Sequence, residues 1–285
     1  MTYRYTIVMH HASSDRKIRL IALDLDDTLL RADLSISETN KAALHRAEQA
    51  GIRIVLASGR NLVSMKRYAD ELLIHRRGDF LIGSNGAELL RASSGEVVER
   101  LHLPPELALR LARAIEKKGF FWQVYIDGAI WCNRMNAWAQ KDHELTGQPL
   151  HVIEDVEGIF ARPHIKIVVC GDPERIETLY RELCSEYAGS IEVVTSKPYF
   201  LEVLPPGVSK GTALARLAQR LSIDMDAVLA IGDARNDYEM IRMAGWGCAP
   251  ANAAEEVRQI ARYVSPRTNE EDAVAEIIGH VVFGE

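Results

Sequence analysis

The sequence predicts an α/β protein with a Rossmann-like parallel-sheet core and an inserted α+β cap domain. Two observations lead to this prediction. Short apolar runs alternate with helix patterns in the first third of the chain, and the same alternation returns near the C-terminus. Between these parts, hairpin patterns are mixed with helices. Alternating strands and helices indicate a parallel sheet covered on both faces, so the middle of the chain is interpreted as an insertion into one discontinuous core.

The first core strands are predicted from apolar runs at 18–24, 52–58 and 79–85. Each run is short and continuous, which is typical of a strand buried on both faces. The stretch between the first two runs predicts a helix, because Ser35 and Glu38 fit the spacing of a capping box. Strand, helix and strand in succession indicate a parallel pair joined by a right-handed crossover.

The core pattern returns in the last third of the chain. A helix is predicted over 209–223, a buried strand over 227–233 and a further helix over 236–245. These elements repeat the rhythm of the N-terminal part, so they are expected to extend the same sheet. The catalytic core is therefore assigned to residues 1–86 and 200–285.

The inserted domain is assigned to residues 87–199. Hairpin turns are predicted at Ser93–Gly95 and at Asp127–Gly128, because Gly and Asp–Gly between apolar runs are strong turn signals. Residues 1–16 are polar and mixed, so they are predicted to form a flexible arm, and the histidine pair within them is not expected to bind metal.

The composition excludes several classes of protein. The 285 residues are 47% hydrophobic and 26% charged, with a net charge of −6, which gives no reason to expect a nucleic-acid or membrane partner. No segment has the length of a membrane span or the pattern of a signal peptide. The four cysteines form no C-x-x-C pair, which suits a reducing cytoplasm.

Polar side chains stand at the ends of four predicted core strands: Asp24, Ser58, Asn85 and Asp233. Ligands of open parallel sheets bind beyond the carboxyl ends of the strands. These four side chains are therefore expected to gather at one edge of the sheet and to form a site there.

Asp24 and Asp26 are two residues apart, so in an extended chain they point the same way. Two like charges on one side favour a shared proton or a cation between them. Asp24 could attack phosphorus and form an aspartyl phosphate. Asp26 could protonate the leaving oxygen and then take a proton from water. A polar turn rich in aspartate would explain the same residues without chemistry.

The stretch "GDARND" adds a third acid, Asp233, at the end of a predicted strand. Together with Asp24 it would offer the hard oxygen ligands that suit Mg²⁺. Asn236 and Asp237 follow at a predicted helix start, where both residue types also occur as ordinary caps.

Ser58 and Gly59 could hold a phosphate oxygen through a hydroxyl and an unobstructed N–H, although a serine cap is the plainer reading. Arg60 could reach a ligand, but a surface ion pair is the expected arrangement. Lys210 opens a predicted helix, where the helix dipole disfavours a cation unless an anion lies nearby. A phosphate and Asp24 would be such anions, whereas a solvated lysine is the usual alternative.

Together these residues supply the parts that phosphoryl transfer requires, namely a nucleophile, an acid or base, a metal site and a cation. The combination resembles the haloacid dehalogenase (HAD) superfamily, specifically its Cof-type phosphatases with a type-2 (IIB) cap. The matching motifs are "DLDDT" at Asp24, Asp26 and Thr28, "ASGR" at Ser58, "NGA" at Asn85, "VSKG" at Lys210, and "GDARND" at Asp233, Asn236 and Asp237.

The resemblance implies Mg²⁺-dependent hydrolysis of a small phosphorylated metabolite, such as a sugar phosphate. It implies that Asp24 is the nucleophile and Asp26 the acid and base, and that Asp237 holds Lys210. It further implies metal ligation by the Asp24 and Asp233 side chains and the Asp26 carbonyl. The residues implied to bind or support the phosphate are Thr28, Ser58, Gly59, Asn85, Lys210 and Asn236.

Two other functions remain open at this point. A phosphomutase would use the same core with a sugar hydroxyl in place of water, and a receiver-type signalling module also carries an acid cluster and a lysine. The insert carries aromatic candidates for substrate contact at Phe120, Phe121, Trp122, Tyr125 and Trp131. Because aromatic residues are usually buried, most of these are expected to be core. Strand alternation predicts that Trp122 and Tyr125 face opposite sides of their sheet.

Overall fold

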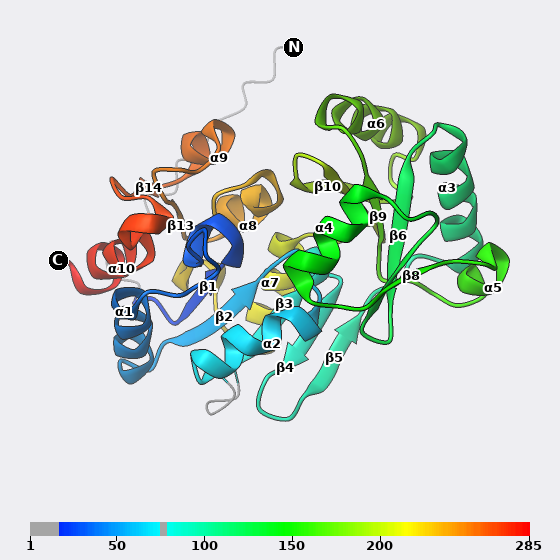
Figure 1. Ribbon diagram of the computed structural model, residues 1–285. Helices are drawn as coiled ribbons and strands as arrows, with labels where there is room; N and C mark the ends of the chain where they lie inside the picture. Colours follow the sequence, from blue (N-terminus) through cyan, green and yellow to red (C-terminus); the bar gives the residue numbers. More distant parts are fainter. Residues whose placement is uncertain (1–16, 75–78) are drawn as a thin grey trace, which may run out of the picture.

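The computed structural model describes residues 17–74 and 79–285, so the predicted N-terminal arm lies outside the described residues. The chain forms two lobes, each built around one β-sheet, which stand side by side in Figure 1. We call them the first lobe and the second lobe. None of the helices in the described ranges has the length and apolar character that crossing a membrane requires.

The sheet of the first lobe has the strand order β14-β13-β12-β1-β2-β3-β4-β5 within the described part of the chain. Its parallel strands are β1 (Leu20–Leu23), β2 (Arg53–Ala57), β3 (Phe80–Gly83), β12 (Val228–Ile231), β13 (Trp246–Ala249) and β14 (Tyr263–Val264). The antiparallel strands β4 (Glu88–Arg91) and β5 (Glu96–Arg100) complete one edge. The predicted Rossmann-like core is confirmed, since β1 lies between β12 and β2.

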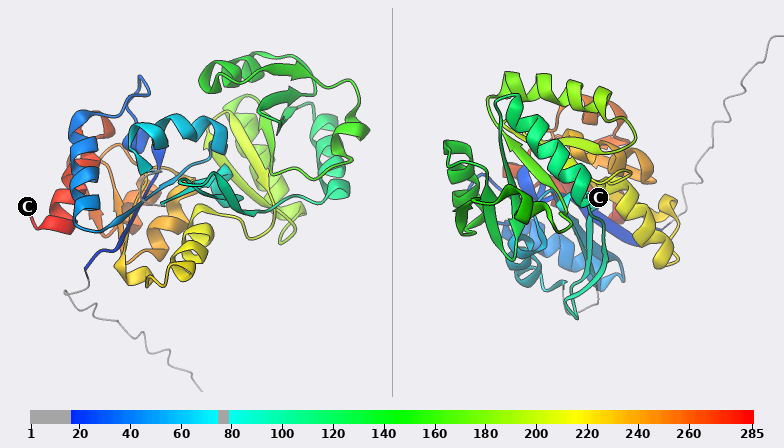
Figure 2. Two further views of the ribbon diagram at one scale, coloured as in Figure 1. Left: turned by 90° about the horizontal axis from the view of Figure 1, so that it is seen from below. Right: turned by 90° about the vertical axis from the view of Figure 1, so that its right-hand side faces the viewer.

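Helices cover both faces of this sheet (Figure 2). Alternate side chains of β1 point to opposite faces, so Ile21 and Leu23 enter one apolar cluster while Leu20 and Ala22 enter another. The first cluster includes side chains of α1 (Glu38–Gln49), α2 (Leu62–Glu71) and α10 (Ala273–Ile278). The second includes side chains of α7 (Lys210–Arg220) and α8 (Tyr238–Met243), and α9 (Glu255–Ile260) packs beside α8. Burial on both faces explains why these strands are continuous apolar runs.

The start of α1 corrects one prediction. Ser37 is the N-cap, and its hydroxyl accepts the backbone N–H of Asn40 at 3.1 Å. The predicted capping box of Ser35 and Glu38 is wrong, because the Ser35 hydroxyl bonds to the carboxylate of Asp33 at 2.5 Å instead. A nearby acid thus competes for the serine that the spacing alone selects.

The sheet of the second lobe has the order β10-β11-β9-β6-β7-β8 within the described residues. Its strands are β6 (Phe121–Ile126), β7 (Ala129–Cys132), β8 (Leu150–Val152), β9 (Ile167–Cys170), β10 (Glu192–Lys197) and β11 (Phe200–Leu204). The turn of the β6–β7 hairpin is at Asp127 and Gly128, as predicted, and both residues have positive φ.

One face of the second sheet packs against helices, and the other is turned partly toward the first lobe. The apolar cluster on the covered face includes side chains of α3 (Pro105–Lys117), α5 (Val156–Phe160) and α6 (Pro173–Glu186). The opposite face carries α4 (Ala137–Thr146) and a smaller cluster that includes Val168 and Phe200. Some side chains of this second face remain available to a ligand.

The predicted boundaries of the insert differ from sheet membership at both ends. The β4–β5 hairpin was assigned to the insert but pairs with β3 in the first sheet, whereas β11 was assigned to the core but pairs with β9 in the second sheet. A hairpin has the same local pattern in either sheet, because membership depends on distant partners. Leu89 of β4 packs among core side chains of the first lobe, which accounts for the difference.

Candidate active site

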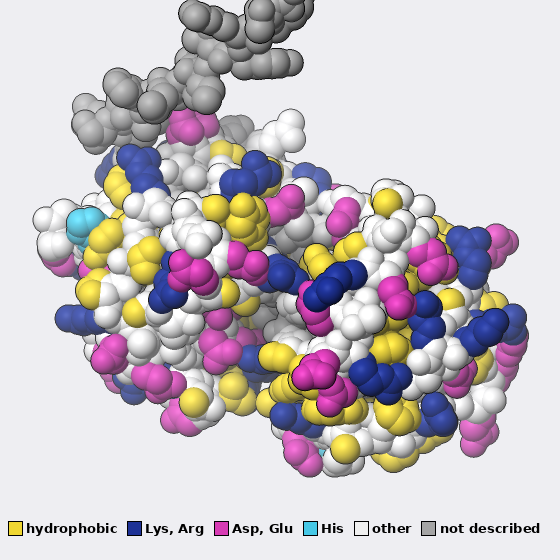
Figure 3. Space-filling view, turned by 90° about the horizontal axis from the view of Figure 1, so that it is seen from above, with side chains coloured by type: hydrophobic (Ala, Val, Ile, Leu, Met, Phe, Trp, Pro, Cys, Tyr) yellow, Lys and Arg dark blue, Asp and Glu magenta, His cyan; other side chains and the backbone are white. Residues whose placement is uncertain are grey.

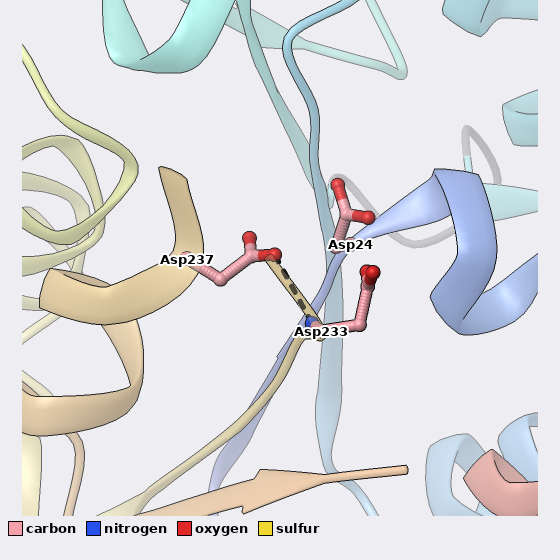
Figure 4. Close-up of side chains that lie close together, drawn as sticks. All are labelled: Asp24, Asp233 and Asp237. Atoms are coloured by element: carbon pink, nitrogen blue, oxygen red, sulfur yellow. Dashed lines mark hydrogen bonds between the residues drawn. The ribbon is translucent and has the colours of Figure 1, made fainter. Parts of the chain in front are cut away.

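Three carboxylates meet at the carboxyl edge of the first sheet. Asp24 follows β1, and Asp233 and Asp237 follow the neighbouring strand β12. One oxygen from each of the three lies within 4.8 Å of the others (Figure 4). The structure therefore brings together acids that are more than 200 residues apart in the chain. Such a set of oxygens could hold a metal ion.

Lys210 lies behind this acid cluster and is completely buried. Its Nζ is 2.5 Å from Asp24 Oδ1 and 2.7 Å from Asp237 Oδ1. It is the first residue of α7, whose N-cap is Ser209. Burial lowers the pKa of Lys210, but Asp237 and Asp24 outweigh this and hold it above its usual range. The lysine therefore stays charged, with its ammonium group shared between two carboxylates.

Asp237 also shapes the loop after β12. Its Oδ2 accepts the backbone N–H groups of Asp233 at 3.2 Å and of Ala234 at 3.1 Å. Gly232 makes this approach possible, since a Cβ at that position would lie 2.5 Å from Asp237 Cγ. The loop therefore needs both the glycine and the acid to present Asp233.

The cluster carries more negative charge than Lys210 compensates. Burial raises the pKa of Asp24 well above its usual range, and Asp237 and Asp233 add to this against the opposing charge of Lys210. Burial and the charge of Asp237 raise the pKa of Asp233 to about 7, although Thr28 Oγ1 donates a hydrogen bond to Asp233 Oδ1 at 2.7 Å. A cation in the cluster would supply the missing positive charge.

Asp26 forms a bidentate ion pair with Arg60. Arg60 Nε lies 2.8 Å from Asp26 Oδ2, and Nη2 lies 2.7 Å from Oδ1. Burial raises the pKa of Asp26, but the hydrogen bonds and charge of Arg60 outweigh it and lower the pKa overall. The side chain of Arg60 is only 11% exposed. The expectation of a surface ion pair for Arg60 was therefore wrong, because its partner stands inside the site.

Ser58 and Gly59 form the loop after β2. Ser58 is buried, and its hydroxyl accepts the backbone N–H of Arg60 at 3.2 Å. The helix α2 begins only at Leu62, with Asn61 as its N-cap. Ser58 is therefore the first residue of this loop and is not the N-cap of α2.

Asn85 follows β3 and links the middle of β11 to the loop after β12. Its amide Nδ2 donates to Glu202 Oε2 at 3.1 Å, and its Oδ1 accepts Asn236 Nδ2 at 3.0 Å. The next residue, Gly86, has φ +101°, and a Cβ there would lie 2.2 Å from the carbonyl oxygen of Ser209. This close approach brings the loop after β3 against the start of α7, where Lys210 lies.

A cleft of about 330 Å³ separates the two lobes. Figure 3 shows the surface hollowed between them, with acidic and basic side chains around the hollow. The predicted site residues that line the cleft are Asp24, Asp26, Ser58, Gly59, Asp233 and Asn236. Those that are buried and absent from its lining are Thr28, Asn85, Lys210 and Asp237. The first group borders the space that a ligand would occupy, and the second group lies directly behind it.

The second lobe adds cleft residues that the sequence did not identify: Asp142, Lys166, Lys197 and Glu202. Lys166 Nζ donates to Glu202 Oε2 at 2.8 Å and to the carbonyl oxygen of Gly59 at 2.9 Å. Lys197 Nζ lies 2.8 Å from Asp27 Oδ2. A signal was present, because Lys166 precedes an apolar run and Glu202 interrupts another. Charged residues in apolar strands indicate a buried pair.

The predicted alternation along β6 is confirmed. Trp122 is buried in the cluster against the helices, whereas Tyr125 lines the cleft on the opposite face. The Tyr125 hydroxyl donates to Asp142 Oδ2 at 2.6 Å. Two of the insert's histidines bond to main-chain carbonyls, His143 to Gln148 and His164 to Ile159. These contacts give both histidines a structural role.

The fold and the cleft define a class. Acids at the carboxyl edge of a Rossmann-like sheet, a buried lysine among them and a second α+β lobe over the opening are the parts of a hydrolase of the phosphatase type.

Comparison with known proteins agrees. The family model for haloacid dehalogenase-like hydrolases matches residues 21–278, and the chain belongs to this family. It is 30% identical over 268 residues to the 5-amino-6-(5-phospho-D-ribitylamino)uracil phosphatase YcsE of Bacillus subtilis (strain 168), covering 94% of this chain and 97% of the relative.

Two solved structures extend the comparison. A haloacid dehalogenase-like hydrolase from Bacteroides thetaiotaomicron superimposes with a TM-score of 0.83 at 34% identity, covering 93% of this chain and 100% of the other. The HAD subclass IIB sugar phosphatase BT4131 superimposes with a TM-score of 0.80 at 22% identity, covering 93% and 99%. The second likeness concerns the fold alone.

Proposed function

We propose that this enzyme removes phosphate from a small phosphomonoester, with Mg²⁺ as its cofactor and Asp24 as its nucleophile. The observation that carries the proposal is the position of Asp24, which lines the cleft beside Asp233 while Lys210 donates to it. The names of the ribitylaminouracil phosphatase and the sugar phosphatase support a phosphorylated sugar or polyol as the substrate.

The acid cluster fits a magnesium ion. Its donors are hard carboxylate oxygens, and the raised pKa of Asp233 reflects charge that a cation would neutralise. We assign the ligands to the side chains of Asp24 and Asp233 and the backbone carbonyl of Asp26. When bound, Mg²⁺ would neutralise charge on the phosphate and make its phosphorus more electrophilic.

The protein residues then carry the reaction in two steps. A carboxylate oxygen of Asp24 attacks phosphorus, the ester P–O bond breaks, and Asp26 gives its proton to the departing oxygen. In the second step Asp26 takes a proton from water, the water oxygen attacks phosphorus, and Asp24 leaves as a carboxylate. Ser58, Gly59 and Lys210 would hold the phosphate oxygens throughout.

The ion pair with Arg60 affects the protonation state of Asp26 in this mechanism. The bidentate pair and the lowered pKa suit the carboxylate form, which the second step needs as its base. The first step needs the protonated form. We therefore expect Arg60 to release at least one Asp26 oxygen when a substrate enters.

We further propose that the first lobe is the catalytic core and that the second lobe is a cap that selects the substrate. Contacts between the lobes at Lys166 and Lys197 support a closed arrangement over the cleft. Cys132, Cys170, Cys184 and Cys248 are free thiols, which supports a cytoplasmic location. The expected partner is a small phosphorylated metabolite rather than a nucleic acid or a membrane.

A phosphate-release panel tests the proposal. Purified enzyme is assayed on many phosphomonoesters with Mg²⁺ and with EDTA, without any sugar acceptor. We expect release from several sugar or polyol phosphates only when Mg²⁺ is present. No release from any ester would overturn the proposal, and release only after a sugar acceptor is added would show a phosphotransferase.

A further inference from the structure

Asp142 is a buried acid on the side of the cleft that belongs to the second lobe. It lies on α4, is 5% exposed and contributes to the cleft lining. Its Oδ2 accepts hydrogen bonds from Gln123 Nε2 and from the Tyr125 hydroxyl, both at 2.6 Å. Asp142 has no role in the proposed phosphoryl-transfer reaction.

The other carboxylates of the cleft have positive partners. The pairs are Asp24 with Lys210, Asp26 with Arg60, Asp27 with Lys197 and Glu202 with Lys166, and Asp233 is assigned to Mg²⁺. Asp142 forms no ion pair with any residue that the structure describes. Burial raises its pKa, and the Tyr125 hydrogen bond and the charge of Lys166 offset this only in part. Its negative charge is therefore incompletely compensated.

The hydrogen-bond network around Asp142 determines which donors or acceptors a ligand must supply. The Tyr125 hydroxyl gives its hydrogen to Asp142 and accepts Gln123 Nε2 at 3.3 Å. What this network still offers is acceptor capacity on Asp142 and Tyr125. A group bound against it must supply O–H donors of its own.

The cations of the cleft are already engaged. Arg31 is paired with Asp272. Arg60 and Lys197 are held by Asp26 and Asp27, and Lys166 is held by Glu202 and by a main-chain carbonyl. Among the residues that the structure describes, every cation of the cleft lining is thus already paired with a carboxylate, so a second anionic group on a substrate would have to compete with that carboxylate, which costs binding energy.

We propose that Asp142, assisted by Tyr125, binds hydroxyl groups of the leaving alcohol, so that the enzyme selects monophosphates of uncharged sugars or polyols over those with a second anionic group. This inference rests on the proposed phosphatase function. Val168 and Phe200 line the cleft in the same cluster as Tyr125 and would contact the carbon skeleton of the alcohol. The volume of about 330 Å³ suits one small metabolite.

Paired substrates test this selection. Each aldose phosphate is compared with its aldonate, as glucose 6-phosphate with 6-phosphogluconate and ribose 5-phosphate with 5-phosphoribonate. The two members share a carbon number and differ by a carboxylate. We expect kcat/KM to favour the uncharged member of a pair by at least about 10-fold, since a buried acid repels the aldonate.

The variant Asp142→Asn separates this role from the chemistry. It keeps the shape of the side chain and removes the charge. We expect kcat/KM for the favoured sugar phosphate to fall about 10- to 100-fold, as for the loss of a hydrogen bond to a charged group. The preference over the aldonate should shrink by a similar factor. Activity on 4-nitrophenyl phosphate, which has no hydroxyl to bind, should stay within about 3-fold.

Two further variants complete the test. Tyr125→Phe keeps the ring, removes one polar group and should give a smaller loss in the same direction, so it carries the test if Asp142→Asn does not fold. Asp127→Asn changes an exposed acid of the β6–β7 turn and should leave kcat/KM for all of the substrates unchanged. The inference is overturned if aldonates are preferred, or if Asp142→Asn and Tyr125→Phe slow 4-nitrophenyl phosphate as much as the sugar phosphates. No release from 4-nitrophenyl phosphate or any other ester by the wild type would instead reject the phosphatase function.

Discussion

The two walls of the cleft are built in different ways. On the first lobe, the polar groups follow directly after strands, at Asp24, Ser58 and Asp233. On the second lobe several of them lie within elements, with Tyr125 inside β6 and Glu202 in the middle of β11. A strand end is visible in the sequence, whereas the side of a sheet that faces a partner is set by the whole fold. The comparison teaches that each reacting group is marked by the residues next to it in the sequence, whereas the groups proposed to select the substrate are not.

Each wall contains one buried lysine, and the two lysines have different partners. Lys210 is shared between Asp24 and Asp237, within the first lobe. Lys166 is paired with Glu202 in the second lobe and also donates to Gly59 of the first. We assign the first lysine to chemistry and the second to joining the lobes. Variants on each wall should therefore affect different measurements.

The largest effect is expected on the first wall, from Asp24→Asn. An amide cannot act as the nucleophile, so kcat should fall by about 10⁴-fold or more, while the thermal unfolding temperature changes little. Phosphate release measures the first quantity and calorimetry the second. The control is Asp33→Asn, an exposed acid outside the cleft lining, which should keep full activity. Wild-type activity in Asp24→Asn would show that Asp24 is not the nucleophile, and the comparison of the two walls would lose its basis.

The metal is the second test of the first wall. Asp233→Asn should raise the Mg²⁺ concentration needed for half-maximal activity by at least about 10- to 100-fold, because a ligand is lost. Wild-type protein should also unfold at a higher temperature when Mg²⁺ is added, since the ion binds only the folded state. This stabilisation should shrink in Asp233→Asn. An identical Mg²⁺ response in variant and wild type would argue against Asp233 as a ligand.

On the second wall, Lys166→Met should lower stability more than it affects the chemical step. It leaves the Glu202 carboxylate buried without its cation, so the free energy of unfolding should fall by about 3–5 kcal/mol. Adding Glu202→Gln should recover part of the loss. The exposed Lys117→Met is the matched control and should change stability by no more than about 0.5 kcal/mol. Urea unfolding measures all three, and a loss that Glu202→Gln deepens would contradict the pairing.

The smallest effect is expected outside both walls, at Asp79 beside β3. Burial raises its pKa to about 6, against the backbone N–H of Ile54 and the charge of Arg53. Because the folded state binds this proton more tightly than the unfolded state, stability should fall as the pH rises from below 4 to above 6. Asp79→Asn removes the charge and should be about 1–3 kcal/mol more stable than wild type at pH 8.

This advantage should disappear near pH 4, where both proteins are uncharged at residue 79. Urea unfolding of the two proteins at both pH values provides the measurement. A difference that does not change with pH would show that burial of the charge is not its cause.

Several features were predictable because they depend on neighbouring residues. The core strands, the turn at Asp127 and Gly128, and the helix that opens with Lys210 were all predicted. The cap of α1 was predicted wrongly, and the predicted boundaries of the insert differ from sheet membership. In the first case Asp33 competes for Ser35, and in the second, pairing with distant strands decides where a hairpin belongs.

The candidate site likewise contains residues that short motifs predict and contacts that depend on distant parts of the chain. The short motifs named the acids and the lysine, and the structure brings them to one edge of the sheet. The partner of Arg60 was missed because Asp26 is 34 residues away in sequence. Asp142 was missed because its surroundings come from α4 and β6 together. Such contacts arise only when residues distant in the sequence are brought together by the folding of each lobe.

The central claim is that Asp24 becomes phosphorylated during turnover. Enzyme mixed with 4-nitrophenyl phosphate carrying radioactive phosphorus and Mg²⁺ is quenched in acid within milliseconds, and the labelled peptide is mapped. We predict label on the peptide that contains Asp24, and no label in Asp24→Asn. Phosphate release without any labelled protein, or label on a different residue, would contradict the account.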